Sequence, residues 1–122
     1  MSTSLIKQPV FGLKKVTVGY WTPSAGNEIS LSLSHPLSVC ELLIFTPFSS
    51  NRYQSSLVND VSHFTTSIKS RLSWDTVESG AQVYHYLDLR RKDDNSIYCE
   101  ASSNIPADTR LEMFALIPEN LV

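Results

Sequence analysis

The chain has 122 residues and a mass of 13.7 kDa, which is enough for one domain with its own core and too little for two. Hydrophobic residues make up 42% of it and charged residues 18%, which excludes intrinsic disorder, and 19 serines supply much of the polar surface. A net charge of -2 and a pI near 5.8 exclude the basic surface on which binding to nucleic acid or to an anionic membrane depends. No apolar run approaches the roughly 18–20 residues of a membrane span, and residues 1–11 lack the apolar stretch of a signal peptide. We therefore predict one domain over residues 1–122, with residues 1–11 as a short leader and with no membrane insertion.

The first third of the chain predicts strands. Gly12–Trp21 and Asn27–Ser34 alternate apolar and polar residues, which is typical of half-buried antiparallel strands. The Pro23–Gly26 stretch between them consists of turn residues, so we predict that the two strands form a hairpin. Val39–Thr46 is almost continuously apolar and ends at Pro47, which favours a strand covered on both faces.

The middle of the chain is more ambiguous. Phe48–Ser56 is rich in Ser and Asn and predicts a loop, followed by a short helical turn at Ser56–Asp60. In Phe64–Trp74 the apolar residues fit a helical stripe that starts at Leu57 and Val61, and they also alternate as in a strand. Ser and Thr are unfavourable inside helices and Thr favours strands, so we predict a strand for Phe64–Trp74.

The last third predicts a hairpin and a closing strand. Gln82–Arg90 and Ser96–Ser103 both alternate, and the polar Lys92–Asn95 turn joins them. Thr109–Ile117 alternates in the same way. Seven or eight short strands without a long helix indicate an all-β fold, a single-domain antiparallel β-sandwich or jelly-roll-like arrangement.

Cysteines and histidines form no metal-binding pattern. Cys40 and Cys99 lie in apolar or alternating segments without C-x-x-C spacing, so we interpret them as buried thiols, with a disulfide between two strands as the alternative. His35, His63 and His85 are scattered singly, whereas zinc needs about four ligands at short spacing. We predict neither a metal nor another cofactor, and the pairing of the two cysteines stays open.

The sequence contains no recognisable catalytic motif. It lacks a G-x-S-x-G nucleophile elbow, and its four glycines cannot build a phosphate-binding loop. The spacing of Asp60, Asp75 and Glu78 favours no glycosidase pair. His85 lies among tyrosines on a predicted strand and is interpreted as a core or interface histidine. We predict that the chain is not an enzyme.

Recognition by loops is the function that these exclusions favour. Loops at the ends of a sandwich commonly carry binding residues, and aromatic rings there stack on sugars while amides and carboxylates bind hydroxyls. The predicted ligand-binding residues are Trp21, Asn51, Tyr53, Asp60, His63 and Trp74. Trp21 and Trp74 each end a predicted strand, so a position in the core is the alternative for both.

One long stretch suggests a family. Gly19–Phe45 leads from a Trp and a Gly/Ser turn into the alternating strand Ile29–Leu33 and then into the consecutive aliphatic residues of Leu42–Phe45. This arrangement resembles the C-terminal receptor-binding or head domains of tailed-bacteriophage tail fibres and related tail proteins. Asp108–Pro118 looks like the final strand of such domains, and the Tyr84–Ser103 hairpin lies where theirs lies.

The resemblance covers about half of the chain and implies a viral structural protein. Such a protein is made in the host cytoplasm, is assembled into the virion, is usually trimeric, and attaches to a saccharide or protein of the bacterial surface. The loops of the family vary too much to assign a functional residue here.

Apolar surface beyond the needs of one core predicts self-association. Tyr84 and Tyr86 lie opposite Val83, Leu87 and Leu89 on one strand, so both of its faces carry large side chains. We predict a homo-oligomer, a trimer before a dimer, with contacts to other virion proteins. Two alternatives stay open, namely a capsid, head-decoration or baseplate structural protein, and a cellular lectin-like sandwich that binds carbohydrate.

Overall fold

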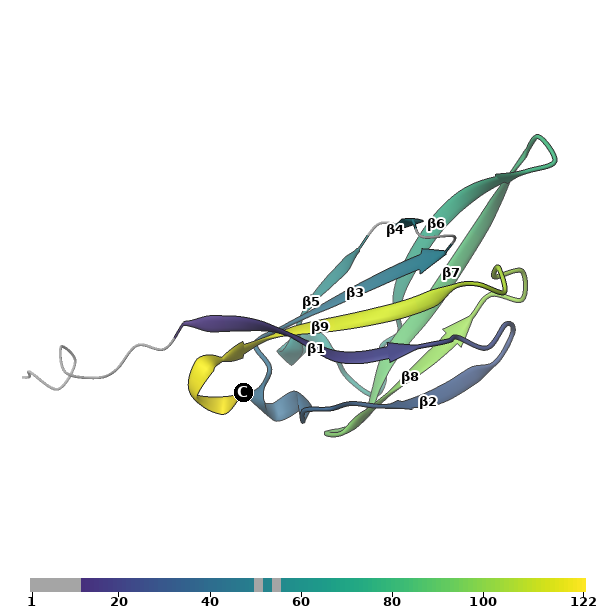
Figure 1. Cartoon of the computed structure of the whole chain (residues 1–122). Helices are drawn as coiled ribbons and strands as arrows, with labels where there is room; N and C mark the ends of the chain where they lie inside the picture. The colour runs from purple at the N-terminus through teal and green to yellow at the C-terminus, as the bar shows by residue number, and fades with distance from the viewer. Residues whose placement is uncertain (1–11, 50–51, 54–55) are drawn as a thin grey trace, which may run out of the picture.

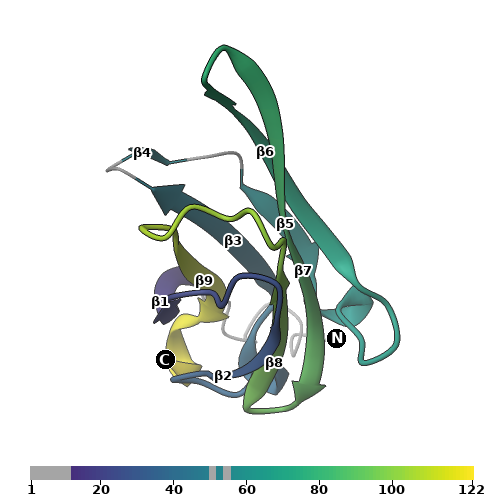
Figure 2. The same cartoon turned by 90° about the vertical axis from the view of Figure 1, so that its right-hand side faces the viewer.

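The computed structural model describes residues 12–49, 52–53 and 56–122, and these form two stacked antiparallel sheets (Figures 1 and 2). The first sheet contains β1 (Leu13–Trp21), β3 (Leu42–Ser49), β4 (Arg52–Tyr53), β5 (Leu57–Asp60) and β9 (Arg110–Pro118). The second contains β2 (Glu28–Ser32), β6 (Ser70–Glu78), β7 (Ala81–Asp93) and β8 (Ser96–Ala101). Three short 3-10 helices, η1 (Leu37–Val39), η2 (Val61–His63) and η3 (Glu119–Leu121), complete the described chain. The predicted all-β sandwich is confirmed.

The core lies between the sheets and takes every second side chain of the central strands. In the first sheet the order is β1-β9-β3, with β5 and β4 both paired to the far edge of β3; in the second it is β2-β8-β7-β6. The fully buried side chains include Phe45, Leu43, Met113, Leu87, Leu89 and Ile97. β3 is thus an interior strand of its sheet, but it is not covered on both faces as its continuous apolar character predicted, because its alternate side chains face outward.

The predicted hairpin between the first two strands is wrong. β1 pairs with β9 and β2 pairs with β8, so the 22–27 connection carries the chain from one sheet to the other. Turn residues there specify a reversal of direction but not a partner. Val18 and Leu31 are nevertheless both buried in the shared core, and the backbone N–H of Ser34 donates to the carbonyl of Val18 at 2.9 Å.

The segment after β3 also differs from its prediction. The strand continues through Pro47 to Ser49, and Leu57–Asp60 forms β5 rather than a helical turn. β5 pairs with β3 up to Phe45 and satisfies backbone groups that a helical turn would leave exposed at the edge of the sheet. The helical turn follows one step later as η2, whose N-cap Asp60 accepts a bond from the backbone N–H of Ser62.

The Phe64–Trp74 strand is confirmed only in its second half. β6 begins at Ser70 and runs on to Glu78, whereas residues 64–69 form a loop. Phe64 is nevertheless buried against Phe45, with ring centroids 5.5 Å apart, while Ile68 is exposed. The alternation before Ser70 therefore does not correspond to two faces of a sheet.

The second sheet contains two consecutive hairpins, β6–β7 and β7–β8. β7 and β8 pair through a turn at residues 94–95, which confirms the predicted hairpin. β6 and β7 pair from Ser70 opposite Leu89 to Glu78 opposite Ala81. Their tight turn is built from Ser79 and Gly80, both with positive φ (52° and 81°), as a two-residue hairpin turn requires. The tip of this β6–β7 hairpin projects beyond the rest of the sandwich (Figures 1 and 2).

Both cysteines are free and buried, as the interpretation of them as interior thiols predicted. Burial raises the pKa of the Cys99 thiol to about 12, with smaller contributions from the nearby carboxylates of Asp88 and Glu28. Burial, and then the charge of Asp94, raises the pKa of the Cys40 thiol to about 11. Both groups are therefore protonated and weakly reactive at neutral pH.

Candidate functional site

The structure does not bring the six predicted ligand-binding residues together. Asp60 lies opposite Leu42, the first residue of β3, whereas Tyr53 lies opposite Phe48 near its last residue. Six residues of strand separate the two positions by about 20 Å. Asp60 and Tyr53 therefore lie at opposite ends of the sandwich.

Asp60 and His63 belong to the η2 end. Both hydrogen bonds that Asp60 accepts come from Ser62, its backbone N–H at 2.9 Å and its hydroxyl at 2.7 Å. These bonds, the hydroxyl's first, lower the pKa of Asp60. His63 ends η2 and is exposed. Asn51 lies outside the described residues.

The two tryptophans pack on the core. Trp74 lies within β6 and is only 6% exposed, so its predicted position in a loop is wrong. Trp21 ends β1 and is half-buried against the core. Its ring covers Gly19 so closely that a Cβ there would lie 1.9 Å from it, which only glycine permits. The core alternative is the one that fits both side chains.

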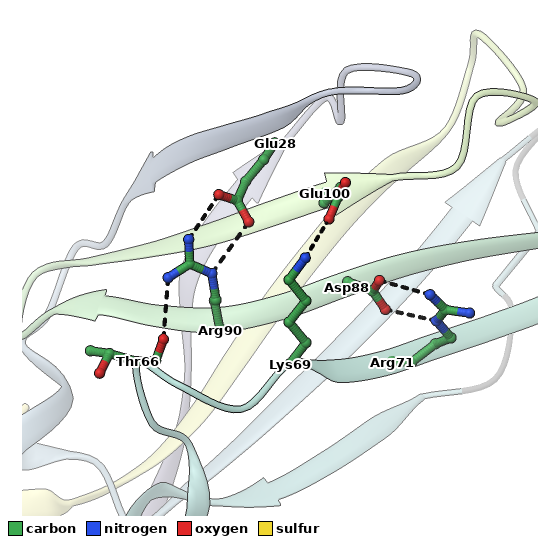
Figure 3. Close-up of polar contacts among 7 residues, drawn as sticks. All are labelled: Glu28, Thr66, Lys69, Arg71, Asp88, Arg90 and Glu100. Atoms are coloured by element: carbon green, nitrogen blue, oxygen red, sulfur yellow. Dashed lines mark hydrogen bonds and ion pairs between the residues drawn. The ribbon is translucent and has the colours of Figure 1, made fainter.

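A charged surface covers the outer side of the second sheet (Figure 3). We call it the charged face, made of Glu28, Lys69, Arg71, Asp88, Arg90 and Glu100. Glu28 lies opposite Glu100, and Glu100 lies opposite Asp88, so three carboxylates form one row across three strands. Like charges directly opposite in a sheet are destabilising.

Each carboxylate of this row has its own cation. Arg71 holds Asp88 with two bonds of 2.8 and 2.9 Å, Arg90 holds Glu28 at 2.8 and 3.3 Å, and Lys69 reaches Glu100 at 2.8 Å. Hydrogen bonds to these carboxylates are the first cause of a raised pKa in all three cations. Arg90 also donates to the carbonyl of Thr66 at 3.2 Å, which ties the 64–69 loop to the sheet (Figure 3). The charged face is therefore neutralised within the chain.

The tyrosines of the same side differ in what covers them. The Arg71 guanidinium lies 3.9 Å from the ring centre of Tyr86, and the Arg90 guanidinium lies 4.2 Å from that of Tyr98. Tyr84 is the more open ring, with 48% of its surface exposed. Its ring centre lies 6.1 Å from that of Tyr86, and its hydroxyl contributes, after Asp88, to the raised pKa of Arg71.

Polar groups surround Tyr84 on the outer side of the β6–β7 hairpin. Asp75 lies directly opposite Tyr84 in the neighbouring strand and accepts a bond from the Gln82 side-chain amide at 3.0 Å. Ser73 lies two pairs further along, on the same side of the sheet and opposite Tyr86, and is exposed. We call Ser73, Asp75, Gln82 and Tyr84 the hairpin site. It combines an open aromatic ring with a hydroxyl, a carboxylate and an amide.

Buried contacts fix the backbone beneath the hairpin site. His85 is fully buried, and its Nε2 and Nδ1 lie 2.7 Å from the Thr76 hydroxyl and 3.1 Å from the Asn104 Oδ1. The Asn104 side-chain amide donates to the carbonyl of Tyr84 at 2.9 Å, and the ring of Trp74 packs on that of His85. The reading of His85 as a core histidine is confirmed. The alternation of β7 places Tyr84 on a strand face but does not distinguish it from the other tyrosines as a ligand candidate, because alternation alone does not show which tyrosine an arginine covers.

The first sheet has a different outer side. We call its outward Leu42, Ile44, Val58, Phe114 and Leu116 the apolar face. Val58 is 55% exposed and the other four are half-buried. Lys15 flanks them from β1, with its ammonium 4.1 Å from the ring centre of Phe114.

Comparison of the chain with protein-family models, with curated proteins and with solved structures finds no match. In the described ranges, no three His, Cys, Asp or Glu side chains are grouped so that they could hold a metal ion. No helix within the same part of the chain is long and apolar enough to cross a membrane.

Proposed function

We propose that this chain is a non-catalytic recognition module that binds a surface saccharide at the hairpin site. The observation that carries the proposal is the open ring of Tyr84 beside Asp75 and Gln82 on a projecting, regularly paired hairpin. Sugar rings stack their C–H faces on aromatic side chains, and their hydroxyls bind carboxylates and amides. A rigid support under Tyr84 lowers the entropy that binding would otherwise cost.

The setting that we propose for this module is a phage tail protein that contacts the bacterial surface. Its support is the resemblance of Gly19–Phe45 and Asp108–Pro118 to tail-fibre head domains, together with the sandwich fold. A gene beside tail and lysis genes would agree with this setting, and a gene among cellular carbohydrate-metabolism genes would contradict it.

The saccharide is tested with a glycan array and with binding to intact bacterial cells. Tyr84→Ala should weaken binding roughly ten-fold, because it removes the stacking ring. Tyr98→Ala is the matched control, a tyrosine of the same sheet and side whose ring is already covered by Arg90. Binding that survives Tyr84→Ala unchanged in a folded variant would contradict the hairpin site.

A second candidate function is a purely structural component of the particle. The apolar face favours it, since a contiguous group of outward hydrophobic side chains is typical of assembly contacts. A chain that associates with itself but binds neither glycans nor cells would support this candidate over the first.

A further inference from the structure

The apolar face breaks the pattern that an outer sheet surface normally shows. In an antiparallel sheet with one solvated side, outward positions are polar. In β3 and β9, however, the outward positions include Leu42, Ile44, Phe114 and Leu116. The outward positions of the neighbouring β1 include Lys15 and Thr17, which are exposed. An apolar centre with a polar rim is the composition of a protein–protein interface.

One row of this face carries opposite charges at its two ends. The register places Lys15, Leu116, Leu42 and Asp60 in line across β1, β9, β3 and β5. Positive charge therefore lies on one flank of the apolar face, negative charge lies on the other, and leucines lie between them.

We propose that a second copy of this chain packs on the apolar face, related to the first by a two-fold axis that runs along the strands between β9 and β3. Such an axis exchanges the two halves of every row. It places Leu116 over Leu42, and it places Lys15 over Asp60 of the second copy at both ends of the contact.

Charge selects this axis over the other in-plane two-fold. A two-fold axis that runs across the strands, through the same row, would place each strand over the same strand of the second copy. It would bring Lys15 onto Lys15 and Asp60 onto Asp60. Like charges facing each other in an interface oppose association, whereas opposite charges fix its register.

The size of the face agrees with a dimer of moderate affinity. β1, β3 and β9, with about eight residues each, and the four-residue β5 lie about 4.8 Å apart and together cover roughly 450 Å² on each copy, which gives about 900 Å² in total. That total lies below the usual range of stable interfaces and is typical of weak, reversible ones, so we expect dissociation in the micromolar range. A closed two-fold pair departs from the trimer predicted from the sequence.

Sedimentation equilibrium of the full chain, between about 1 and 100 μM, tests the proposal with charge reversals. Lys15→Glu and Asp60→Lys should each weaken the dimer about ten-fold, because each places like charges over one another at both ends of the interface. The double variant should restore association. Lys14→Glu is the matched control, because Lys14 lies opposite the buried Ile117 and hence on the other side of the sheet.

A second variant keeps the test valid if Asp60→Lys disturbs η2. Val58→Asp places a charge on the apolar face at an exposed position and should abolish the dimer while circular dichroism stays unchanged. A chain that is monomeric throughout, a double variant that does not restore association, or an oligomer that tolerates both Lys15→Glu and Val58→Asp would overturn the proposal.

Discussion

The outer sides of the two sheets differ in how their charged side chains are arranged. On the charged face, Glu28, Glu100 and Asp88 lie in one row, and three cations of the same chain neutralise them. On the apolar face, the charges of Lys15 and Asp60 lie at opposite ends of a row with leucines between them. A surface whose charges are satisfied internally needs no partner, whereas a surface with separated charges and outward hydrophobic groups gains from one.

Alkaline pH should destabilise the core that lies beneath both faces, because this core contains the two buried thiols. The folded pKa values of Cys99 and Cys40, about 12 and about 11, lie above the ordinary thiol value of 9.0. Their contribution to stability is therefore complete below pH 9 and is lost as the pH rises through 11 and 12.

In chemical denaturation, the free energy of unfolding should accordingly fall steeply between pH 8 and pH 11. Both sheets should unfold in one transition, because they share one core. At pH 8 a thiol reagent should label the protein only after denaturant is added. The Cys40→Ala/Cys99→Ala double variant should show a flatter pH dependence. Rapid labelling of the native protein at pH 8 would contradict the burial of the thiols.

Removing one cation should change the melting temperature more on the charged face than on the apolar face. Arg71→Met should lower the melting temperature by about 5 °C, because it leaves the nearly buried carboxylate of Asp88 without its bidentate partner. Lys15→Met, on the apolar face, should change it by about 1 °C or less at concentrations where the chain is monomeric, because Lys15 is exposed and its contact with the ring of Phe114 is a surface cation–π contact. Equal shifts in the two variants, measured by thermal unfolding, would remove the distinction between the faces.

The smallest effect is expected within the row of carboxylates. Glu100→Gln removes the partner of Lys69 but also relieves the repulsion from Glu28 and Asp88 on either side. The two changes oppose each other, so the free energy of unfolding should shift by less than about 0.5 kcal/mol. Denaturant titration checks this, with Glu112→Gln on the first sheet as the control. A loss several times larger would mean that the repulsion along the row is negligible.

Part of the fold and little of the site could be predicted from the sequence. The strands around Ile29, Leu87, Cys99 and Met113 follow from strict alternation, and the β7–β8 hairpin follows from alternation joined by a tight polar turn. The partners of β1 could not be predicted in this way, because β9 lies at the other end of the chain and no local pattern records that distance. The sequence does not distinguish β5 from a helical turn, because four residues are too few to show whether apolar side chains recur with the period of a strand or of a helix.

Residue type and expected loop position indicate the candidate ligands in the sequence, but the tertiary structure places some of them in strands. Trp74 satisfies both criteria in the sequence but is buried against His85, whereas Tyr84 lies in a strand and is open. Tyr84 also differs from Tyr86 and Tyr98 on the same side of the sheet, because Arg71 and Arg90 cover those two rings. A single sequence does not show which ring a distant guanidinium will cover.

The alternation of side chains between two surfaces, and the two layers that hide the apolar half, follow from the residue order alone, because a pleated strand turns successive residues to opposite sides. Which strands lie next to each other depends on how the whole chain packs. This packing aligned three carboxylates on one outer side and set Lys15 in line with Asp60 on the other. Pairing between distant strands depends on the packing of the whole core, and a row across a sheet exists only once its strands are in register.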